Sequence, residues 1–208
     1  SGACPTLPSS ATHVYLNNNS FTSLPALPNA IEILNISENR LTDIPQLPST
    51  LTTLYAYGKE TTSGYPDYTP IKLNSLENWT ISGGEGTGLT GLYIDGISKL
   101  PTNIHNLSAL GTLSANGTPV DGPLPTMPTS LRLVYMSLAG ITNVSGLSGC
   151  DELTQVSLTG NSITTIAGLT ASKSTITHLF VNHNELTDGD FSTFTAPMSY
   201  LYVGDNQL

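Results

Sequence analysis

Residues 153–163 read LTQVSLTGNSI and residues 176–186 read ITHLFVNHNEL, two stretches that share one spacing of apolar residues. In each stretch a first apolar anchor is followed by a second three positions later and by a third two positions after that. An asparagine stands three residues beyond the third anchor, and a further apolar residue follows two positions later. The copies begin at Leu153 and Ile176, 23 residues apart, so the chain repeats a unit of about this length.

The same pattern recurs along nearly the whole chain, in steps of 20 to 23 residues wherever consecutive copies are clear. The first anchors are Ala11, Ile31, Leu51, Leu89, Leu110, Leu131, Leu153, Ile176 and Met198. The second and third anchors alternate with period two, which predicts a short strand with one inward face in each copy. Stacked copies form coils whose strands lie side by side in one parallel sheet on the concave side of an arc. The asparagine turns the chain, and we expect its buried amide to bond the backbone of neighbouring coils.

This spacing is the L-x-x-L-x-L-x-x-N-x-L pattern, and the chain resembles the leucine-rich repeat proteins. Residues 24–28 (LPALP) and 44–48 (IPQLP) resemble the short repeats of bacterial effector proteins, and residues 140–147 resemble the 22-residue repeats of bacterial internalin-type surface proteins. The resemblance implies an α/β-type leucine-rich repeat solenoid. Because proline lacks an N–H and disfavours helix, we expect an extended convex side in the first half. Residues 100–107 (LPTNIHNL) instead indicate a helical turn.

The expected organisation is a short N-terminal segment over residues 1–10, a cap remnant, followed by a single repeat domain over residues 11–208 with about nine or ten coils. Residues 57–88 break the pattern. The 38 residues from Leu51 to Leu89 fit two short coils of 19, whereas residues 57–88 alternatively form a degenerate coil with a protruding loop or an irregular linker packed on the convex side. The chain ends in mid-coil at Leu208, so we expect it to continue, or another segment or chain to cover this end.

Composition excludes several classes of partner. Six Lys and Arg against fifteen Asp and Glu give a net charge of −9, which cannot supply the basic patch that nucleic acid or anionic lipid requires. No apolar run approaches the roughly 18 residues of a membrane span, so membrane insertion is not expected. Ser and Thr number 52 of 208 residues, which favours an extracellular or cell-surface protein.

The two cysteines, Cys4 and Cys150, lie about six coils apart, on the order of 30 Å. A disulfide needs Cα atoms closer than about 7 Å, so these two cannot pair within one chain. We expect Cys150 to be buried in the core.

Motifs for catalysis and metal binding are absent from the sequence. It contains no Gly-x-Ser-x-Gly nucleophile motif and no Gly-Lys-Ser/Thr phosphate loop, and the glycine-rich residues 83–88 indicate a flexible loop. His178 and His183 are close in sequence, but we interpret both as surface polar residues. The sequence therefore predicts no enzyme activity, no cofactor and no metal site.

The residue between the second and third anchors points out of the concave sheet in every coil. These residues, called the aromatic column below, are Tyr15, Asn35, Tyr55, Tyr93, Ser114, Tyr135, Ser157, Phe180 and Tyr202. Six of the nine are aromatic in a chain that is 7% aromatic, so the column is not random. Aromatic residues favour strands and can stabilise a sheet laterally, which is the structural interpretation. Exposed aromatic surface also suits protein or glycan recognition, which is the functional one.

The candidate ligand-binding residues are the aromatic members of the column together with neighbouring positions expected to be exposed. The neighbours are Tyr57, Asp95, Arg132, His178 and Tyr200. The sequence thus predicts a non-enzymatic recognition module that binds a protein ligand in its concave face, as a surface, secreted or phage-associated adhesion domain. One alternative is a carbohydrate-binding adhesin that uses the tyrosines as stacking platforms. Another is the substrate-recognition domain of a bacterial effector enzyme.

Overall fold

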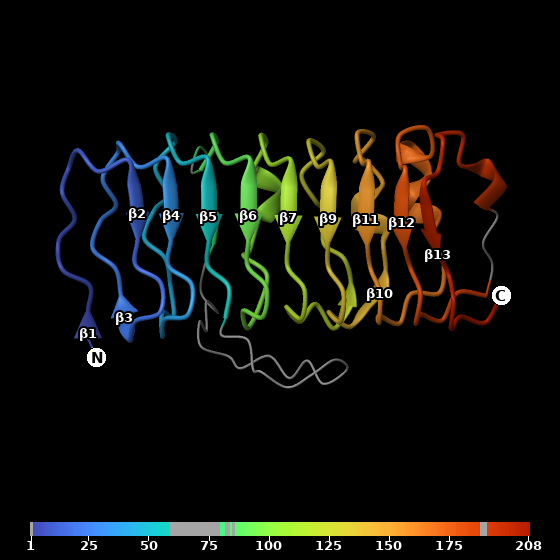
Figure 1. Cartoon of the computed structure of the whole chain (residues 1–208), viewed down its shortest axis with the longest axis horizontal. Coiled ribbons are helices and arrows are strands. Elements are labelled where there is room, and N and C mark those ends of the chain that lie inside the picture. Colours follow the sequence, from blue (N-terminus) through green and yellow to red (C-terminus); the bar gives the residue numbers. More distant parts are fainter. Residues whose placement is uncertain (1, 59–79, 82–83, 85, 188–190) are drawn as a thin grey trace.

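The computed structural model describes residues 2–58, 80–81, 84, 86–187 and 191–208. In these residues the main sheet has nine strands, all parallel, in the order β13-β12-β11-β9-β7-β6-β5-β4-β2 (Figure 1). They are β2 (His13–Tyr15), β4 (Ile33–Asn35), β5 (Thr53–Tyr55), β6 (Gly91–Tyr93), β7 (Thr112–Ser114), β9 (Leu133–Tyr135), β11 (Gln155–Ser157), β12 (His178–Phe180) and β13 (Tyr200–Tyr202). Each strand covers the predicted alternating segment of one repeat, so the expected solenoid with a parallel sheet is confirmed.

The core is a continuous apolar column inside the stacked coils. In the main sheet, the middle residue of each strand from β4 to β12 is fully buried, as Leu34, Leu92 and Val156 show. In β13 the equivalent Leu201 is 41% exposed. Each coil contacts mainly its neighbours, as expected of a solenoid. No helix among the described residues is long and apolar enough to cross a membrane.

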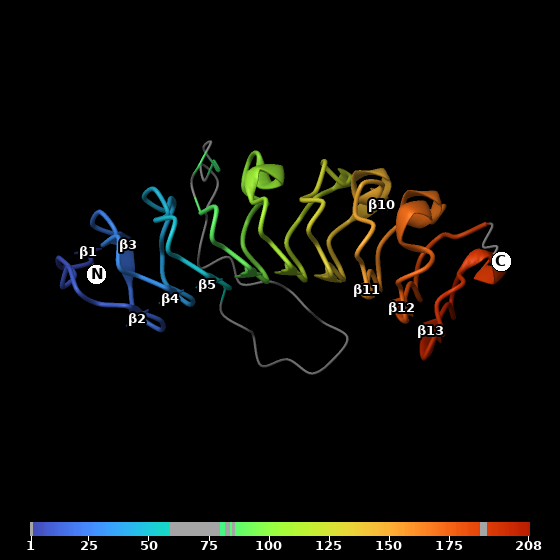
Figure 2. The same ribbon diagram turned by 90° about the horizontal axis from the view of Figure 1, so that it is seen from above.

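The convex side carries the return segments. It holds four 3-10 helices, η1 (Ile104–Asn106), η2 (Ser145–Leu147), η3 (Ala167–Ser172) and η4 (Phe191–Thr193), and the short strands β1 (Gly2–Ala3), β3 (Phe21–Ser23), β8 (Gly122–Pro123) and β10 (Ile141–Asn143). Figure 2 shows the helical turns near the middle of the arc on the side away from the main sheet. Residues 24–28 and 44–48 contain no helix, and η1 lies within residues 100–107, so the predicted difference between the returns is confirmed.

In the second half of the chain, the return segments of neighbouring coils pack so closely that Gly146 and Gly168 leave no room for a larger residue. A methyl group on Gly168 in η3 would run into the carbonyl oxygen of Val144, and one on Gly146 in η2 would meet the carbonyl oxygen of Pro125. Neither obstacle is a flexible side chain, so any larger residue would push the coils apart.

The repeated asparagines hold neighbouring coils together as predicted. Asn161 Nδ2 donates to the carbonyl oxygens of Met136 in the preceding coil and Leu158 in its own, at 2.9 and 2.8 Å. Its Oδ1 accepts from the N–H groups of Ala139 and Ile141, both at 3.0 Å. The same bonds to the preceding coil recur at the other members of this asparagine ladder, Asn39, Asn184 and Asn206.

The residue just before the asparagine position adopts a left-handed conformation in most coils. The residues with positive φ there are Asn18, Glu38, Gly96, Gly117, Leu138, Gly160, His183 and Asp205. Glycine, asparagine and aspartate tolerate this conformation at little cost, whereas a branched side chain is strained in it. Leu138, with φ of 57°, is therefore an exception.

The irregular region lies between β5 and β6, which are adjacent strands of the main sheet. Thr53 pairs directly with Gly91 across 38 residues, so β5 and β6 are neighbours in the main sheet. Ile81 is fully buried, and its N–H donates to the carbonyl oxygen of Thr102, which places residues 80–81 in the convex wall. The expected protruding loop falls largely on residues 59–79, outside the described residues.

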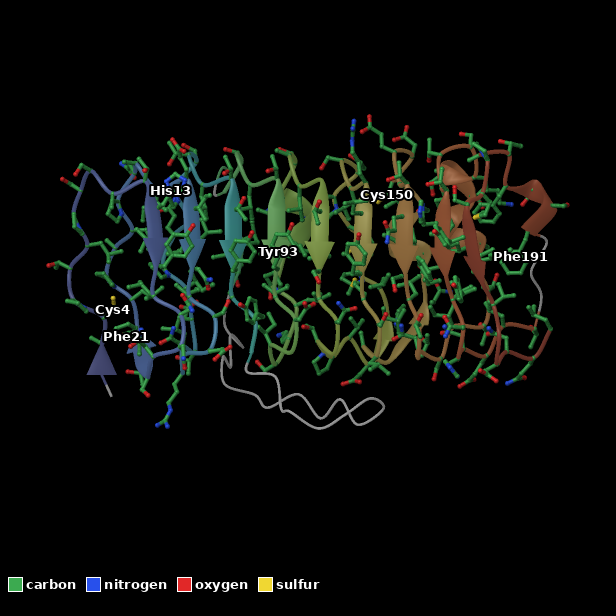
Figure 3. The ribbon with its side chains drawn as sticks, in the orientation of Figure 1. Cys4, His13, Phe21, Tyr93, Cys150 and Phe191 are labelled. Carbon is green, nitrogen blue, oxygen red and sulfur yellow. The ribbon has the colours of Figure 1, made fainter. Side chains whose placement is uncertain are left out.

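Both cysteines are free and buried, in well-separated coils (Figure 3). The Cys150 thiol donates to the carbonyl oxygen of Pro128 at 3.3 Å, so the prediction of a buried core residue is confirmed. Burial, reinforced by the negative charge of Asp151, raises the pKa of Cys150 to about 11. Burial also raises the pKa of Cys4.

Candidate functional site on the concave face

The aromatic column forms one unbroken row across the sheet. The strand register pairs Tyr15 with Asn35, then Tyr55, Tyr93, Ser114, Tyr135, Ser157, Phe180 and finally Tyr202. Because side chains alternate across a strand, all nine lie on the face opposite the buried middle residues. Figure 3 shows Tyr93 near the middle of this face.

The central cluster consists of Tyr55, Tyr93 and Tyr135. The rings of Tyr55 and Tyr93 stack at 4.8 Å between centroids, with 16° between their planes. Gly91, in the same strand, makes room for this arrangement, since a methyl group there would lie 3.2 Å from the Tyr93 ring. Partial burial, and then the charges that Tyr55 and Tyr135 would carry as phenolates, raise the pKa of Tyr93. All three rings are half-buried, which leaves them accessible from the concave side.

A second cluster of rings lies on β12 and β13. His178 lies against Tyr200 at 4.9 Å between centroids, and Phe180 stacks on Tyr202 at 5.1 Å. Tyr200 and Tyr202 are 51% and 52% exposed. A hydrogen bond of 2.8 Å between Thr177 Oγ1 and Nδ1 of His178 orients the imidazole.

A polar network lies beside the central cluster. The Ser114 hydroxyl donates to the Asp95 carboxylate, at 2.8 and 3.0 Å from its two oxygens, and the Asn116 N–H donates to the same carboxylate at 2.6 Å. Asn116 Oδ1 accepts from the N–H of Ser137 at 2.9 Å, and the hydroxyls of Ser137 and Ser157 lie 3.2 Å apart. Polar side chains from β6 to β11 are thus linked into one chain of hydrogen bonds.

Arg132 does not occupy an exposed strand position, contrary to expectation. Arg132 precedes β9, whose first residue is Leu133. In the sheet register Leu133 pairs with Gln155 of β11, which in turn pairs with His178 of β12. Its guanidinium instead forms an exposed ion pair with Glu152, with Nη2 2.7 Å from Oε2. The one-residue offset moves Arg132 to the edge where the strands begin.

Tyr57 and Asp95 also lie outside the strands. Both follow the third anchor directly, in a row at the edge where the strands end, and both are half-buried. The Tyr57 N–H donates to Ser37 Oγ in the preceding coil at 3.3 Å.

The histidines are not brought together. His178 faces the ring cluster, whereas Nδ1 of His183 lies 3.2 Å from the Asp205 carboxylate. Within the described ranges no group of three or more His, Cys, Asp or Glu side chains could hold a metal ion.

Leu138 is a candidate residue that the repeat pattern did not single out. It is 44% exposed, and its side chain lies over Gly160 of the next coil, where a methyl group would come within 2.6 Å of Cδ2. The sequence feature that could have identified Leu138 is a large aliphatic residue at a position that other repeats fill with polar residues or glycine. Leu138 thus combines a left-handed backbone conformation with an exposed apolar side chain.

No model of a known protein family matches the sequence, and no curated protein matches it. Several solved structures are similar in fold. An internalin (InlF) from Listeria monocytogenes superposes with a TM-score of 0.73 at 21% identity, covering 96% of this chain and 56% of that one. A leucine-rich repeat protein of Leptospira interrogans gives 0.67 at 18% identity, covering 93% and 49%. The functional domain of InlJ from Listeria monocytogenes gives 0.50 at 18%, covering 90% and 52%.

The chain therefore spans about half the length of the structures that it matches. Their agreement with the repeat spacing and the nine-stranded parallel sheet concerns the fold. The chain is a leucine-rich repeat solenoid, with the fold of the bacterial internalin and leucine-rich repeat proteins that it resembles.

Proposed function

We propose that this chain is a non-enzymatic recognition module that binds a protein ligand in the concave face of its main sheet. The observation that carries the proposal is the register of the aromatic column, which gathers rings from six strands onto one accessible face. Half-buried aromatic side chains on a rigid sheet offer large contact area with little loss of conformational entropy on binding. Such residues dominate the energetics of many protein interfaces.

The rings are not required by the core. The buried middle residues and the asparagine ladder already hold the coils together, whereas Tyr15 is 62% exposed. Serine occupies the same strand position in β7 and β11, as Ser114 and Ser157, so the sheet accepts a small side chain there. We therefore interpret the aromatic surface as additional to what the fold needs.

The proposed setting is the cell surface or the extracellular space. The chain's hydroxyl-rich composition supports it, with 23 Ser and 29 Thr, and so does the likeness to the internalin fold. Adhesion to another cell or to a host protein is the role that this setting favours.

A glycan ligand is the second candidate, and the cluster on β12 and β13 favours it. The exposed rings of Tyr200 and Tyr202 adjoin uncharged hydrogen-bonding groups, since Gln155 pairs with His178 and Asn182 follows β12. Aromatic faces beside amides and hydroxyls suit the stacking and hydrogen bonding of a neutral sugar.

The test is a triple variant in which Tyr55, Tyr93 and Tyr135 are replaced by serine, screened with the parent against panels of surface proteins and glycans. A protein ligand of the parent should lose affinity by about 2 kcal/mol or more in the variant. The control is Phe21→Ser, which removes an aromatic ring from β3 on the convex side and leaves the concave face unchanged. Protein ligands that bind parent and folded triple variant equally would contradict the proposal, and glycans alone would favour the second candidate.

A further inference from the structure

Aromatic rings and serines alternate along the middle of the aromatic column. From β6 to β12 the third residues of the strands are, in sheet order, Tyr93, Ser114, Tyr135, Ser157 and Phe180. A ring therefore occurs on every second strand, on β6, β9 and β12, with β7 and β11 between them (Figure 1). Because neighbouring strands lie about 4.8 Å apart, successive rings are spaced by about 9.6 Å along the solenoid.

A stacked pair of rings bounds this alternation at each end. At one end Tyr93 stacks on Tyr55 of the neighbouring strand β5, at 4.8 Å between centroids. At the other end Phe180 stacks on Tyr202 of the neighbouring strand β13, at 5.1 Å. The alternating segment, defined by the rings of Tyr93, Tyr135 and Phe180, therefore extends over four strand spacings, about 19 Å.

The outward face of the strands carries no formally charged residue. The first and third residues of the nine strands of the main sheet share this face, and they include no Asp, Glu, Lys or Arg. The fifteen acidic and six basic residues of the chain lie elsewhere. A charged ligand segment would lose its hydration here without gaining a counter-charge from the strands, which is costly. The face therefore favours an uncharged segment.

The spacing of the rings matches the repeat of one peptide conformation. A polyproline II helix has three residues per turn and rises about 3.1 Å per residue, so residues i, i+3 and i+6 share one side at intervals of about 9.3 Å. Over the two ring intervals, this repeat departs from that of the rings by less than about 1 Å. An α-helix presents one side every 10.5 Å or so and a strand about every 6.8 Å, so both lose step with the rings sooner.

The side chains between the rings suit the chemistry of proline. Proline has no N–H, and a polyproline II helix makes no internal hydrogen bonds, so such a ligand presents carbonyl acceptors. Thr112 on β7 and Gln155 and Ser157 on β11 carry hydroxyl and amide donors, and all three are half-buried on the face of the rings. The Ser157 hydroxyl lies 3.2 Å from that of Ser137, from which it can accept while donating its own proton to a ligand. Donors thus alternate with rings along the segment.

We propose that the alternating segment binds an uncharged, proline-rich segment of the protein ligand in the polyproline II conformation. Prolines at i, i+3 and i+6 pack on the rings of Tyr93, Tyr135 and Phe180, and the ligand runs across the strands, along the solenoid. This inference rests on the proposed function and specifies the chemistry of the partner. A preformed polyproline II helix loses little conformational entropy on an aromatic surface, which favours this mode of recognition.

The probes are end-blocked triproline, hexaproline, nonaproline and dodecaproline, measured on the parent protein by calorimetry. The dissociation constant should fall about tenfold or more from triproline to nonaproline, because only the longer peptide reaches all three rings. From nonaproline to dodecaproline it should fall by no more than about threefold, since the stacked pairs end the alternation. A nonapeptide whose three central prolines are replaced by glycine should bind about tenfold more weakly than nonaproline.

The protein variants are Tyr135→Ser and the double variant Tyr135→Ser with Ser157→Tyr. The double variant keeps the number of rings but moves the central ring by one strand, from β9 to β11, so the ring spacing becomes unequal. Tyrosine and serine both occur at this strand position in the parent, so the sheet accepts either. We expect both variants to weaken nonaproline binding about tenfold or more, and Phe21→Ser, on the convex side, to change it by less than about twofold.

The two proposals fail in different ways. The polyproline site is overturned by a parent that binds nonaproline no more tightly than triproline, or by a double variant that binds nonaproline as tightly as the parent. The screen of the triple Tyr→Ser variant then still decides the recognition surface. Cellohexaose is measured beside the peptides, and binding of this sugar alone, weakened by Tyr135→Ser, overturns both proposals in favour of a glycan ligand. The peptide series uses the parent protein, so its result stands even where the double variant fails to fold.

Discussion

The asparagine ladder and the aromatic column repeat with the same period, but they serve different purposes. Asn161 is buried, and four hydrogen bonds satisfy backbone groups that no strand reaches. Tyr93 is half-buried and stacks on one neighbour. Both features recur because the coil recurs, so periodicity alone does not separate fold from function. What separates them is what each side chain satisfies inside the molecule.

The largest effect is expected in the ladder. Replacing Asn161 by alanine leaves the N–H groups of Ala139 and Ile141 and the carbonyl oxygens of Met136 and Leu158 without this partner. Buried unsatisfied polar groups cost about 1–3 kcal/mol each, so we expect a loss of at least about 3 kcal/mol. Urea unfolding measures it.

Asn19→Ala is the control for Asn161. Asn19 is exposed and bonds only carbonyl oxygens of its own coil, those of Leu16 and Asn17. Its replacement should cost less than about 1 kcal/mol. Equal losses at the two positions would show that the ladder does not join the coils in the way described.

Alkaline pH tests the interior directly. The pKa of Cys150 is about 11 in the folded chain against an ordinary 9.0, so the folded state keeps its proton after the unfolded chain has lost it. The corresponding stability is fully present below pH 9 and is lost as the pH rises toward 11, by up to about 2–3 kcal/mol. The raised pKa of Tyr93 acts in the same direction above pH 10.

Urea unfolding of the parent and of Cys150→Ala between pH 8 and 11 measures the effect. The stability difference between the two proteins should fall over this range, because the alanine variant lacks the thiol. A difference that stays constant would show that the thiol is not buried in the folded chain.

Gly168→Ala sharpens the comparison, because here neighbouring coils meet through backbone rather than through an amide. The added methyl group meets the carbonyl oxygen of Val144, and we expect a loss of about 1–3 kcal/mol. Gly204→Ala is the control, since nothing lies within 4 Å of its methyl group. Similar melting temperatures for the two variants would contradict the close approach of η2 and η3.

A smaller effect on stability is expected in the column. The triple replacement of Tyr55, Tyr93 and Tyr135 by serine should cost on the order of 1 kcal/mol, the scale of aromatic stacking, rather than the ~3–5 kcal/mol of one core aromatic. Thermal unfolding measures it. A loss as large as that of Asn161→Ala would make the column structural and would remove the basis of the proposed site.

The smallest effect is that of reductant on the monomer. Cys4 and Cys150 are free, so the melting temperature should not change. A decrease of several degrees would mean that the two cysteines pair, and hence that the order of the coils is wrong.

The sequence was sufficient for features that depend on the repeat period. The register from Tyr15 to Tyr202 could be predicted because a period-two strand fixes which side chains share a face. Arg132 was misplaced by one residue, since β9 begins only at Leu133. The position of Leu138 and the close approach at Gly168 depend on backbone angles and on how coils stack, which no single repeat encodes.

The asparagine ladder has a direction that bears on synthesis. The oxygen of Asn39 accepts from the N–H of Phe21, that of Asn184 from Ile163 and that of Asn206 from Leu186, so in each case an N–H is satisfied by the coil that comes next in the chain. A ribosome delivers the coils in this same order. At these coils the later asparagine therefore completes its predecessor, and the earlier coil keeps an unsatisfied N–H until that asparagine has been synthesised.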